Sequence, residues 1–417
     1  MFRFLHAADI HLDSPLRGLE TYPDAPVEQI RGAARRAFDN LVALAIEEGV
    51  AFVLLAGDLF DGDWKDYNTG LYFMHRMGRL REAGIAVYLV AGNHDAASQL
   101  TKALRLPDNV CLFSHKKPEC RIREDLGVAI HGQGFAGRSV QEDLSRGFAQ
   151  AVPGLCNIGL LHTSLTGRAG HEPYAPCTLE GLMSKGYDYW ALGHVHQREV
   201  VHTHPWVVFP GNIQGRHIRE AGAKGCTLVT VEDGRVRDVE AREIDVLRFG
   251  VCRVDLAGCE RIDGIRDRVR EALEQDRRAA EGRPLAARII LEGATPLHAR
   301  LHRDAGHLRE ELRALAADLG DVWLEKLSIF SRPVVESRET QDSDSPLAGL
   351  MHAIRQVRLD ASLLELVPEF EALRTKLPAE LLGAADPFCP DEEGLATLRD
   401  DVSELLTAKL QEGRHEN

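Results

Sequence analysis

Five short and mostly apolar runs in the first half of the chain constrain its fold more than any other feature. They span residues 2–8, 50–56, 85–91, 157–161 and 187–192, and glycines or polar residues follow each of them. Runs of this kind are typical of strands that are buried on both faces of a sheet.

The first three runs are separated by two segments with apolar residues at helical spacing. These segments span residues 27–48 and 69–83, and Gly49 and Gly84 follow them as helix stops. Strands joined by helices of this length pair in parallel. Farther along, residues 225–231 and 236–244 flank a turn sequence that is typical of a hairpin. The first 243 residues therefore predict a mixed, layered α/β sandwich.

A polar cluster follows each of the five runs. The residues with ligand-type side chains are Asp9 and His11, then Asp58 and Asp61, then Asn93, His94 and Asp95, then His162, and finally His194 and His196. Because the carboxyl ends of parallel strands meet at one edge of a sheet, we expect these side chains to lie together. Carboxylates, imidazoles and one amide form a ligand mix that suits Mn²⁺, Fe²⁺ or Zn²⁺. The pattern predicts a two-metal site that hydrolyses phosphate esters.

Each cluster also has a purely structural interpretation. Asp9 and Asp58 could cap helices, residues 92–95 could form a turn, and His194 and His196 could be ordinary loop histidines. Five clusters in order, all at strand ends, favour the metal site over these separate interpretations.

The motifs D-x-H, G-D-x-x-D, G-N-H-D, a single H and G-H-x-H together resemble those of the calcineurin-like metallophosphoesterase superfamily. Residues 4–13 and 210–217 resemble its DNA-repair exonuclease branch, the SbcD-like and YhaO-like nucleases. The resemblance covers residues 1 to 245. It implies an α/β/β/α sandwich with a small α+β cap and a helical C-terminal tail. It also implies two-metal hydrolysis of DNA in DNA repair, as an exonuclease or endonuclease, with Mn²⁺ as the favoured ion.

The resemblance also assigns roles to individual residues. Asp58 would bridge two ions, with Asp9, His11 and His196 completing the first site and Asn93, His162 and His194 the second. His94 would be a catalytic acid or phosphoryl-stabilising group, and either Asp95 or Asp61 would hold its tautomer.

The rest of the chain divides into two further regions. Residues 247–256, 287–291 and 322–329 are expected to form strands, and residues 262–281 and 305–319 helices, in the order of a small α+β unit. A polar, acidic linker is expected at 337–345, followed by three amphipathic helical segments. We therefore predict a nuclease domain at 1–244, a capping domain at 245–332, and a linker with a helical, partner-docking region at 333–417.

The charge of the chain is unusual for a protein that acts on nucleic acid, because such proteins are expected to have a basic face. The net charge is −14, but residues 335–417 carry 8 basic and 18 acidic side chains, which leaves the remainder with 42 and 46. This distribution permits DNA binding without requiring it. The basic residues expected to contact a DNA backbone are Arg17, Arg138, Arg168, Arg198, Arg216, Arg219 and Lys224.

The sequence predicts neither a membrane span nor a signal peptide, since it has no apolar run of membrane-spanning length and no leader. Its 8 cysteines form no C-x-x-C pair, which fits free thiols in the cytoplasm.

Two alternative functions remain open at this stage. The same motifs would serve a phosphatase or a small-molecule phosphodiesterase, because they specify chemistry and not substrate. A non-catalytic DNA-end adaptor of a coiled-coil ATPase is the other alternative. The resemblance implies DNA and an SbcC-type coiled-coil ATPase as partners. It also implies a possible homodimer through the helix at 69–83, whose apolar residues exceed one core-facing stripe: Leu71, Tyr72, Phe73, Met74, Met77 and Leu80.

Overall fold

The computed structural model describes residues 1–14, 32–61, 67–97, 105–165 and 175–334 of the 417-residue chain. The expected linker at 337–345 and the helical segments after it lie outside the described residues. Residues Met1–Arg332 form one compact unit. Among the described residues, no helix is both long enough and apolar enough to cross a membrane.

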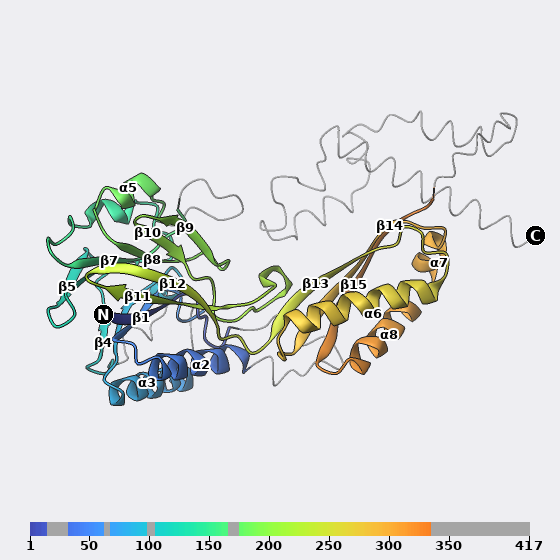
Figure 1. Cartoon of the computed structure of the whole chain (residues 1–417), viewed down its shortest axis with the longest axis horizontal. Coiled ribbons are helices and arrows are strands. Elements are labelled where there is room, and N and C mark those ends of the chain that lie inside the picture. Colours follow the sequence, from blue (N-terminus) through green and yellow to red (C-terminus); the bar gives the residue numbers. More distant parts are fainter. Residues whose placement is uncertain (15–31, 62–66, 98–104, 166–174, 335–417) are drawn as a thin grey trace, which may run out of the picture. The chain divides into compact units, whose positions relative to one another are not determined.

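The first sheet has six strands in the order β12-β11-β1-β2-β3-β4. Its strands β1, β4, β11 and β12 are labelled in Figure 1. Strands β1 to β4 are parallel, and β11 pairs with β1 in the antiparallel direction. The hairpin expected from the sequence joins β11 to β12, and its turn residues Asp233 and Gly234 both have positive φ. The strands are β1 (Phe2–Ala7), β2 (Phe52–Ala56), β3 (Ala86–Val90), β4 (Val110–Leu112), β11 (Gly225–Glu232) and β12 (Arg235–Glu243).

The second sheet also has six strands, in the order β5-β6-β7-β8-β10-β9. Its four central strands are parallel and its two edge strands are antiparallel to their neighbours. The strands are β5 (Glu119–Arg123), β6 (Val128–Gln133), β7 (Cys156–His162), β8 (Tyr189–Gly193), β9 (Glu199–Thr203) and β10 (Trp206–Phe209).

The two sheets pack face to face, and helices cover their outer faces. Between the sheets, the ring of Phe4 stacks on Phe52 and meets Tyr189 edge-on. Helices α2 (Ala33–Glu47) and α3 (Tyr67–Glu82) pack on the outer face of the first sheet. The short helix α5 (Leu179–Met183) packs against the second sheet through a cluster that includes Trp190. The α/β/β/α sandwich predicted from the sequence is therefore confirmed.

The backbones of the two sheets come very close together at one edge. A Cβ atom on Gly193 of β8 would lie 1.9 Å from the carbonyl oxygen of Ala56 of β2. Within the first sheet, one on Gly92 after β3 would lie 2.2 Å from Oδ1 of Asp58 after β2. Only glycine leaves room for this approach. The glycine that ends β8 therefore allows side chains from both sheets to share one site, and the glycine that follows β3 leaves room for the Asp58 carboxylate.

A third sheet follows β12 and has its own hydrophobic core. Its strands are all parallel, and the strand–helix order expected from the sequence is present, with the additional short helix α7. The elements are β13 (Arg248–Asp255), α6 (Ile262–Ala279), β14 (Leu285–Ala294), α7 (His298–Arg303), α8 (Ala305–Asp318) and β15 (Val322–Arg332).

Candidate metal centre

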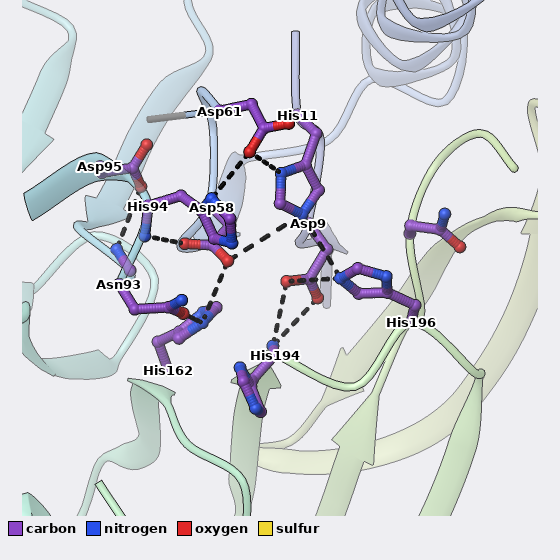
Figure 2. Close-up of polar contacts among 12 residues, drawn as sticks. Asp9, His11, Asp58, Asp61, Asn93, His94, Asp95, His162, His194 and His196 are labelled. Carbon is purple, nitrogen blue, oxygen red and sulfur yellow. Dashed lines mark hydrogen bonds and ion pairs between the residues drawn. The ribbon is translucent and has the colours of Figure 1, made fainter. Parts of the chain in front are cut away.

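All of the side chains that the sequence predicts as metal ligands lie together at the carboxyl ends of β1, β2, β3, β7 and β8 (Figure 2). The loops after β1 and β2 run side by side, because the backbone N–H groups of Asp9 and His11 donate to the carbonyl oxygens of Gly57 and Asp58. Strand β7 ends beside β8, with His162 opposite Gly193. The parallel order of the strands thus produces the cluster.

Asp58 lies at the centre of this cluster. Its Oδ2 is 3.5 Å from Nε2 of His162 and 3.9 Å from Nε2 of His11. Its Oδ1 accepts a hydrogen bond of 2.9 Å from the backbone N–H of His94. One carboxylate oxygen therefore faces two separate groups of ligand atoms, which is the position required of a bridging ligand.

The first group consists of Asp9, His11 and His196, whose ligand atoms lie within 4.8 Å of one another. Nε2 of His11 is 3.3 Å from Nε2 of His196, and the latter is 3.8 Å from Oδ1 of Asp9. Burial lowers the pKa of both imidazoles. Neutral imidazoles whose ring nitrogens converge beside a carboxylate form a donor set suited to a transition-metal ion.

The second group contains His162, Asn93 and His194. Nδ1 of His162 donates to the carbonyl oxygen of Ala56 at 2.9 Å, so its Nε2 carries a lone pair. That Nε2 faces the amide oxygen of Asn93 at 2.9 Å. Two acceptor atoms that face each other repel, and a cation bound to both removes the repulsion. The His194 ring packs edge-on against His162, with centroids 5.2 Å apart.

The buried carboxylates also favour a cation at this site. Burial raises the pKa of Asp58 to about 6. Burial and the nearby charge of Asp58 also raise the pKa of Asp9. Two carboxylates that are costly to ionise together become stable as anions when positive ions lie between them. The residues present therefore fit a dinuclear metal centre.

Backbone strain accompanies the ligand positions. Asp9, His11, Asp58 and His194 have φ angles of 51°, 46°, 51° and 104°, a region that residues other than glycine rarely adopt. Such conformations persist only where the surrounding structure enforces them, and they concentrate at functional sites.

His94 lies beside this cluster and has a carboxylate partner. Its Nδ1 is 2.7 Å from Oδ1 of Asp61, and Asp61 also accepts a 2.7 Å hydrogen bond from Ser14. The hydrogen bond to His94 holds the pKa of Asp61 down to about 2, and the same bond raises the pKa of His94. Of the two carboxylates proposed from the sequence as its partner, Asp61 therefore has the required geometry.

Asp95, the other proposed partner, has a different environment. Its carboxylate accepts hydrogen bonds of 2.9–3.1 Å from the backbone N–H groups of Leu59, Phe60 and Gly92. These bonds tie the loop after β2 to the loop after β3. They favour a role for Asp95 in positioning these two loops in place of the role suggested by the sequence, which was to hold the tautomer of His94.

Sequence reasoning missed Glu220, a buried carboxylate in the turn η3 (Ile218–Glu220). Its Oε1 is 2.7 Å from Nδ1 of His196. Burial raises the pKa of Glu220, but the hydrogen bond from His196 and the charge of Arg216 lower it by more. The only signal in the sequence was its place shortly after the family-like segment 210–217.

The structure describes five of the seven basic residues that were expected to contact DNA, and these five fall into two sets. Arg198 donates to Thr227, and the buried Lys224 donates to the carbonyl oxygen of His196 at 3.0 Å, so the structure gives both a supporting role instead. Arg138 and Arg219 are exposed, and Arg216 is half-buried beside the ligand cluster. Arg17 and Arg168 lie outside the described residues.

Comparisons with known proteins agree with this architecture. The model for calcineurin-like phosphoesterases matches residues 2–198, and the model for the middle domain of metallophosphoesterase YhaO matches residues 249–332. The chain belongs to the calcineurin-like phosphoesterase family, whose members use a dinuclear metal site.

Among its relatives, the uncharacterized metallophosphoesterase YhaO of Bacillus subtilis (strain 168) is 36% identical over 316 residues, which is 75% of this chain and 76% of that protein. The DNA double-strand break repair protein Mre11 of Sulfurisphaera tokodaii is 25% identical over 307 residues, which is 70% of this chain and 73% of that protein. The crystal structure of TT1561 of Thermus thermophilus superimposes with a TM-score of 0.36 and 16% identity, covering 58% of this chain and 99% of that one.

Proposed function

We propose that this protein is a two-metal phosphodiester hydrolase that acts on DNA. The observation that carries the proposal is the position of Asp58, whose carboxylate faces both groups of ligand atoms. Asp9, His11 and His196 would hold one ion, and Asn93, His162 and His194 the other. Such a pair of ions activates water and clamps the phosphoryl oxygens of the substrate. Mn²⁺ is our first choice of ion, with Fe²⁺ and Zn²⁺ as the other candidates.

The chain supplies a separate group for proton transfer. With Nδ1 of His94 bound to Asp61, its Nε2 is the ring nitrogen that can donate to the substrate. Because the Asp61 bond raises the pKa of His94, the protonated ring is favoured. We propose that His94 protonates the leaving oxygen or stabilises the phosphoryl group, and that Asp61 fixes its tautomer.

The choice of DNA as substrate rests on similarity and on charge. The chain is similar to proteins named as DNA double-strand break repair proteins. Excess acidic charge lies in residues 335–417, which leaves the remaining 334 residues close to neutral. We also propose an SbcC-type coiled-coil ATPase as a partner, docking through residues 333–417, with a nuclease domain at 1–244 and a capping domain at 245–332. The seven described cysteines are free thiols, which supports a cytoplasmic location.

The proposal is tested by incubating the protein and Mn²⁺ with labelled duplex, hairpin and single-stranded DNA, beside a chromogenic phosphodiester. We expect cleavage of at least one DNA and of the ester, and loss of both activities in Asp58→Asn. Hydrolysis of the ester with no attack on any DNA would favour a phosphatase or small-molecule phosphodiesterase. Metal-dependent DNA binding without hydrolysis of any substrate would favour the end adaptor.

A further inference from the structure

One short segment, residues 212–224, connects the candidate metal ligand His196 to the third sheet. We propose that Glu220 in this segment is a positioning residue for His196, and that packing of η3 on the third sheet sets metal affinity at one of the two sites. The inference rests on the metal assignment proposed above.

Glu220 is fixed by several hydrogen bonds besides the one to His196. Its Oε2 accepts from Nδ2 of Asn212 at 2.9 Å and from the backbone N–H of Arg216 at 2.8 Å. Its Oε1 accepts from Nη2 of Arg216 at 3.0 Å as well as lying 2.7 Å from Nδ1 of His196. A carboxylate held in this way fixes both the tautomer and the orientation of the imidazole, so that Nε2 points at the first ligand group.

The turn that carries Glu220 is itself anchored on the third sheet. Ile218 and Ala221, which flank Glu220, pack with Trp323 of β15 against the buried cluster formed by Leu247, Phe249 and Ala286. The backbone N–H of Gly222 donates to the carbonyl oxygen of Phe249 at 2.9 Å. The position of Glu220 is therefore set from one side by the metal centre and from the other by β13 and β15.

Two more residues of this segment, Gln214 and Lys224, bind the junction that leads into β13. The Gln214 amide donates to the carbonyl oxygen of Leu247 at 2.7 Å and accepts from the backbone N–H of Val246 at 2.9 Å. Lys224 donates its Nζ to the carbonyl oxygen of His196, while its own carbonyl oxygen accepts from the N–H of Ile244 at 3.1 Å. We therefore expect movement at the junction to reach His196 by two routes. Glu220 binds the side chain of His196, and Lys224 binds its backbone carbonyl oxygen.

This arrangement gives the third sheet a specific influence on the metal centre. In the second ligand group, His162 is held by the carbonyl oxygen of Ala56 in the first sheet and faces Asn93. Among the described hydrogen bonds, neither His162 nor Asn93 is bonded to residues 212–224, and only His194 of this group lies on the same loop as His196. A change in the packing of η3 should therefore weaken binding of the ion held by His196 and leave the other ion in place.

The first experiment titrates the full-length protein with Mn²⁺ by calorimetry. We expect wild type to bind two ions, and Glu220→Gln to bind one of them about 10- to 100-fold more weakly, the range typical for loss of a carboxylate partner of a metal-bound histidine. The other ion should bind within about threefold of wild type. Melting temperature measured without metal reports on folding of the variant.

The second experiment compares two aromatic residues of β15. Trp323 packs on the cluster that supports η3, whereas Phe330 on the same strand is 64% exposed. Trp323→Ala should lower the affinity for the same single ion as Glu220→Gln does. Phe330→Ala should leave the affinity for both ions unchanged.

Three outcomes would overturn the inference. In the first, Glu220→Gln binds both ions with wild-type affinity. In the second, Glu220→Gln loses the same affinity for both ions, and in the third, Trp323→Ala and Phe330→Ala bind both ions equally well. A wild-type protein that binds no Mn²⁺, Fe²⁺ or Zn²⁺ would instead overturn the metal assignment itself.

Discussion

The two buried carboxylates at the centre of the site make metal binding compete with protons. Since burial raises the pKa of Asp58 to about 6, an ion that binds below that pH must displace a proton. We expect the apparent affinity for Mn²⁺ to rise with pH, by about tenfold per pH unit for each proton displaced, and the contribution of Asp58 to level off above pH 6. Calorimetric titrations at a series of pH values measure this dependence.

The metal-free protein should show the opposite trend in stability. A raised pKa in the folded state stabilises the protein while Asp58 is protonated, and this contribution is lost as the pH rises through about 6. Asp58→Asn lacks the titrating group, so its melting temperature should fall less than that of wild type over this range. Two results would contradict this account of Asp58: a Mn²⁺ affinity that does not change with pH, and melting temperatures of wild type and Asp58→Asn that change in parallel with pH.

His94 is expected to act on the substrate without holding an ion. His94→Gln should bind both ions and still lose about 10²- to 10⁴-fold in turnover, the range typical of a general acid. Asp61→Asn removes the negative charge from the hydrogen-bond acceptor that raises the pKa of His94, so the alkaline limb of the pH–rate profile should move to lower pH. The checks are kcat with a chromogenic phosphodiester and anomalous scattering from Mn²⁺ in crystals. One missing ion in His94→Gln would make His94 a ligand.

The sequence predicted that these residues would lie together because most of them directly follow strands. The parallel order of the strands is sufficient to bring together Asp9, Asp58, Asn93 and His194. Glu220 could not be predicted in the same way, because its contact with His196 depends on how the turn η3 packs. Whether Asp61 or Asp95 holds His94 was also undecided, since both follow strand ends. The contact between Asp61 and His94 and the backbone hydrogen bonds of Asp95 distinguish them, and neither can be predicted from spacing.

At the scale of the elements, the junction between the two sheets is the most sensitive point. Gly193→Ala would place a Cβ atom 1.9 Å from the carbonyl oxygen of Ala56, so β2 or β8 must shift. We expect a loss of about 1–3 kcal/mol in the free energy of unfolding, as for other overpacked interiors. Metal binding should weaken too, because the shift moves His194.

Gly78→Ala is the matched control for this substitution. Gly78 lies inside α3 with no atom within 4 Å of its added Cβ, and alanine favours helix. This variant should gain about 0.5–1 kcal/mol. Denaturant unfolding of both variants provides the comparison, and equal effects on stability would contradict the close approach of the two sheets.

The sequence predicted some of the helices and strands but not others. Long apolar runs predicted β1, β2, β3, β7 and β8, and helical spacing predicted α2, α3, α6 and α8, but the central strands β6 and β10 of the second sheet were not predicted. The edge strands β5 and β9 and the short helix α7 have no such signal, because half-exposed strands and single-turn helices have mixed composition. In α3, Phe73 was one of the apolar residues in excess of a single core-facing stripe, but it is buried in the core cluster that includes residues of α2 and the first sheet.

At the scale of the whole molecule, the surface of α3 sets a limit on self-association. Phe73, Met77 and Leu80 are buried in the core of the chain. Tyr72 donates to Asp39 at 2.6 Å and lies between the guanidinium groups of Arg35 and Arg76. The apolar surface available for pairing is therefore smaller than the sequence predicted, and it centres on Leu71.

A homodimer through α3 should consequently be weak. Leu71 is 63% exposed, but stable interfaces usually bury well over about 1,000 Å². We expect sedimentation to show a monomer–dimer equilibrium with a midpoint on the order of micromolar or above. A small interface leaves little net free energy of binding once the entropy lost on association has been subtracted. Leu71→Asp should shift the equilibrium to monomer. Ile122→Asp on the edge strand β5, where Ile122 is 51% exposed, should not. A protein that stays monomeric at every concentration, with Mn²⁺ or DNA present, would rule out pairing through α3, and equal effects of both substitutions would place the contact elsewhere.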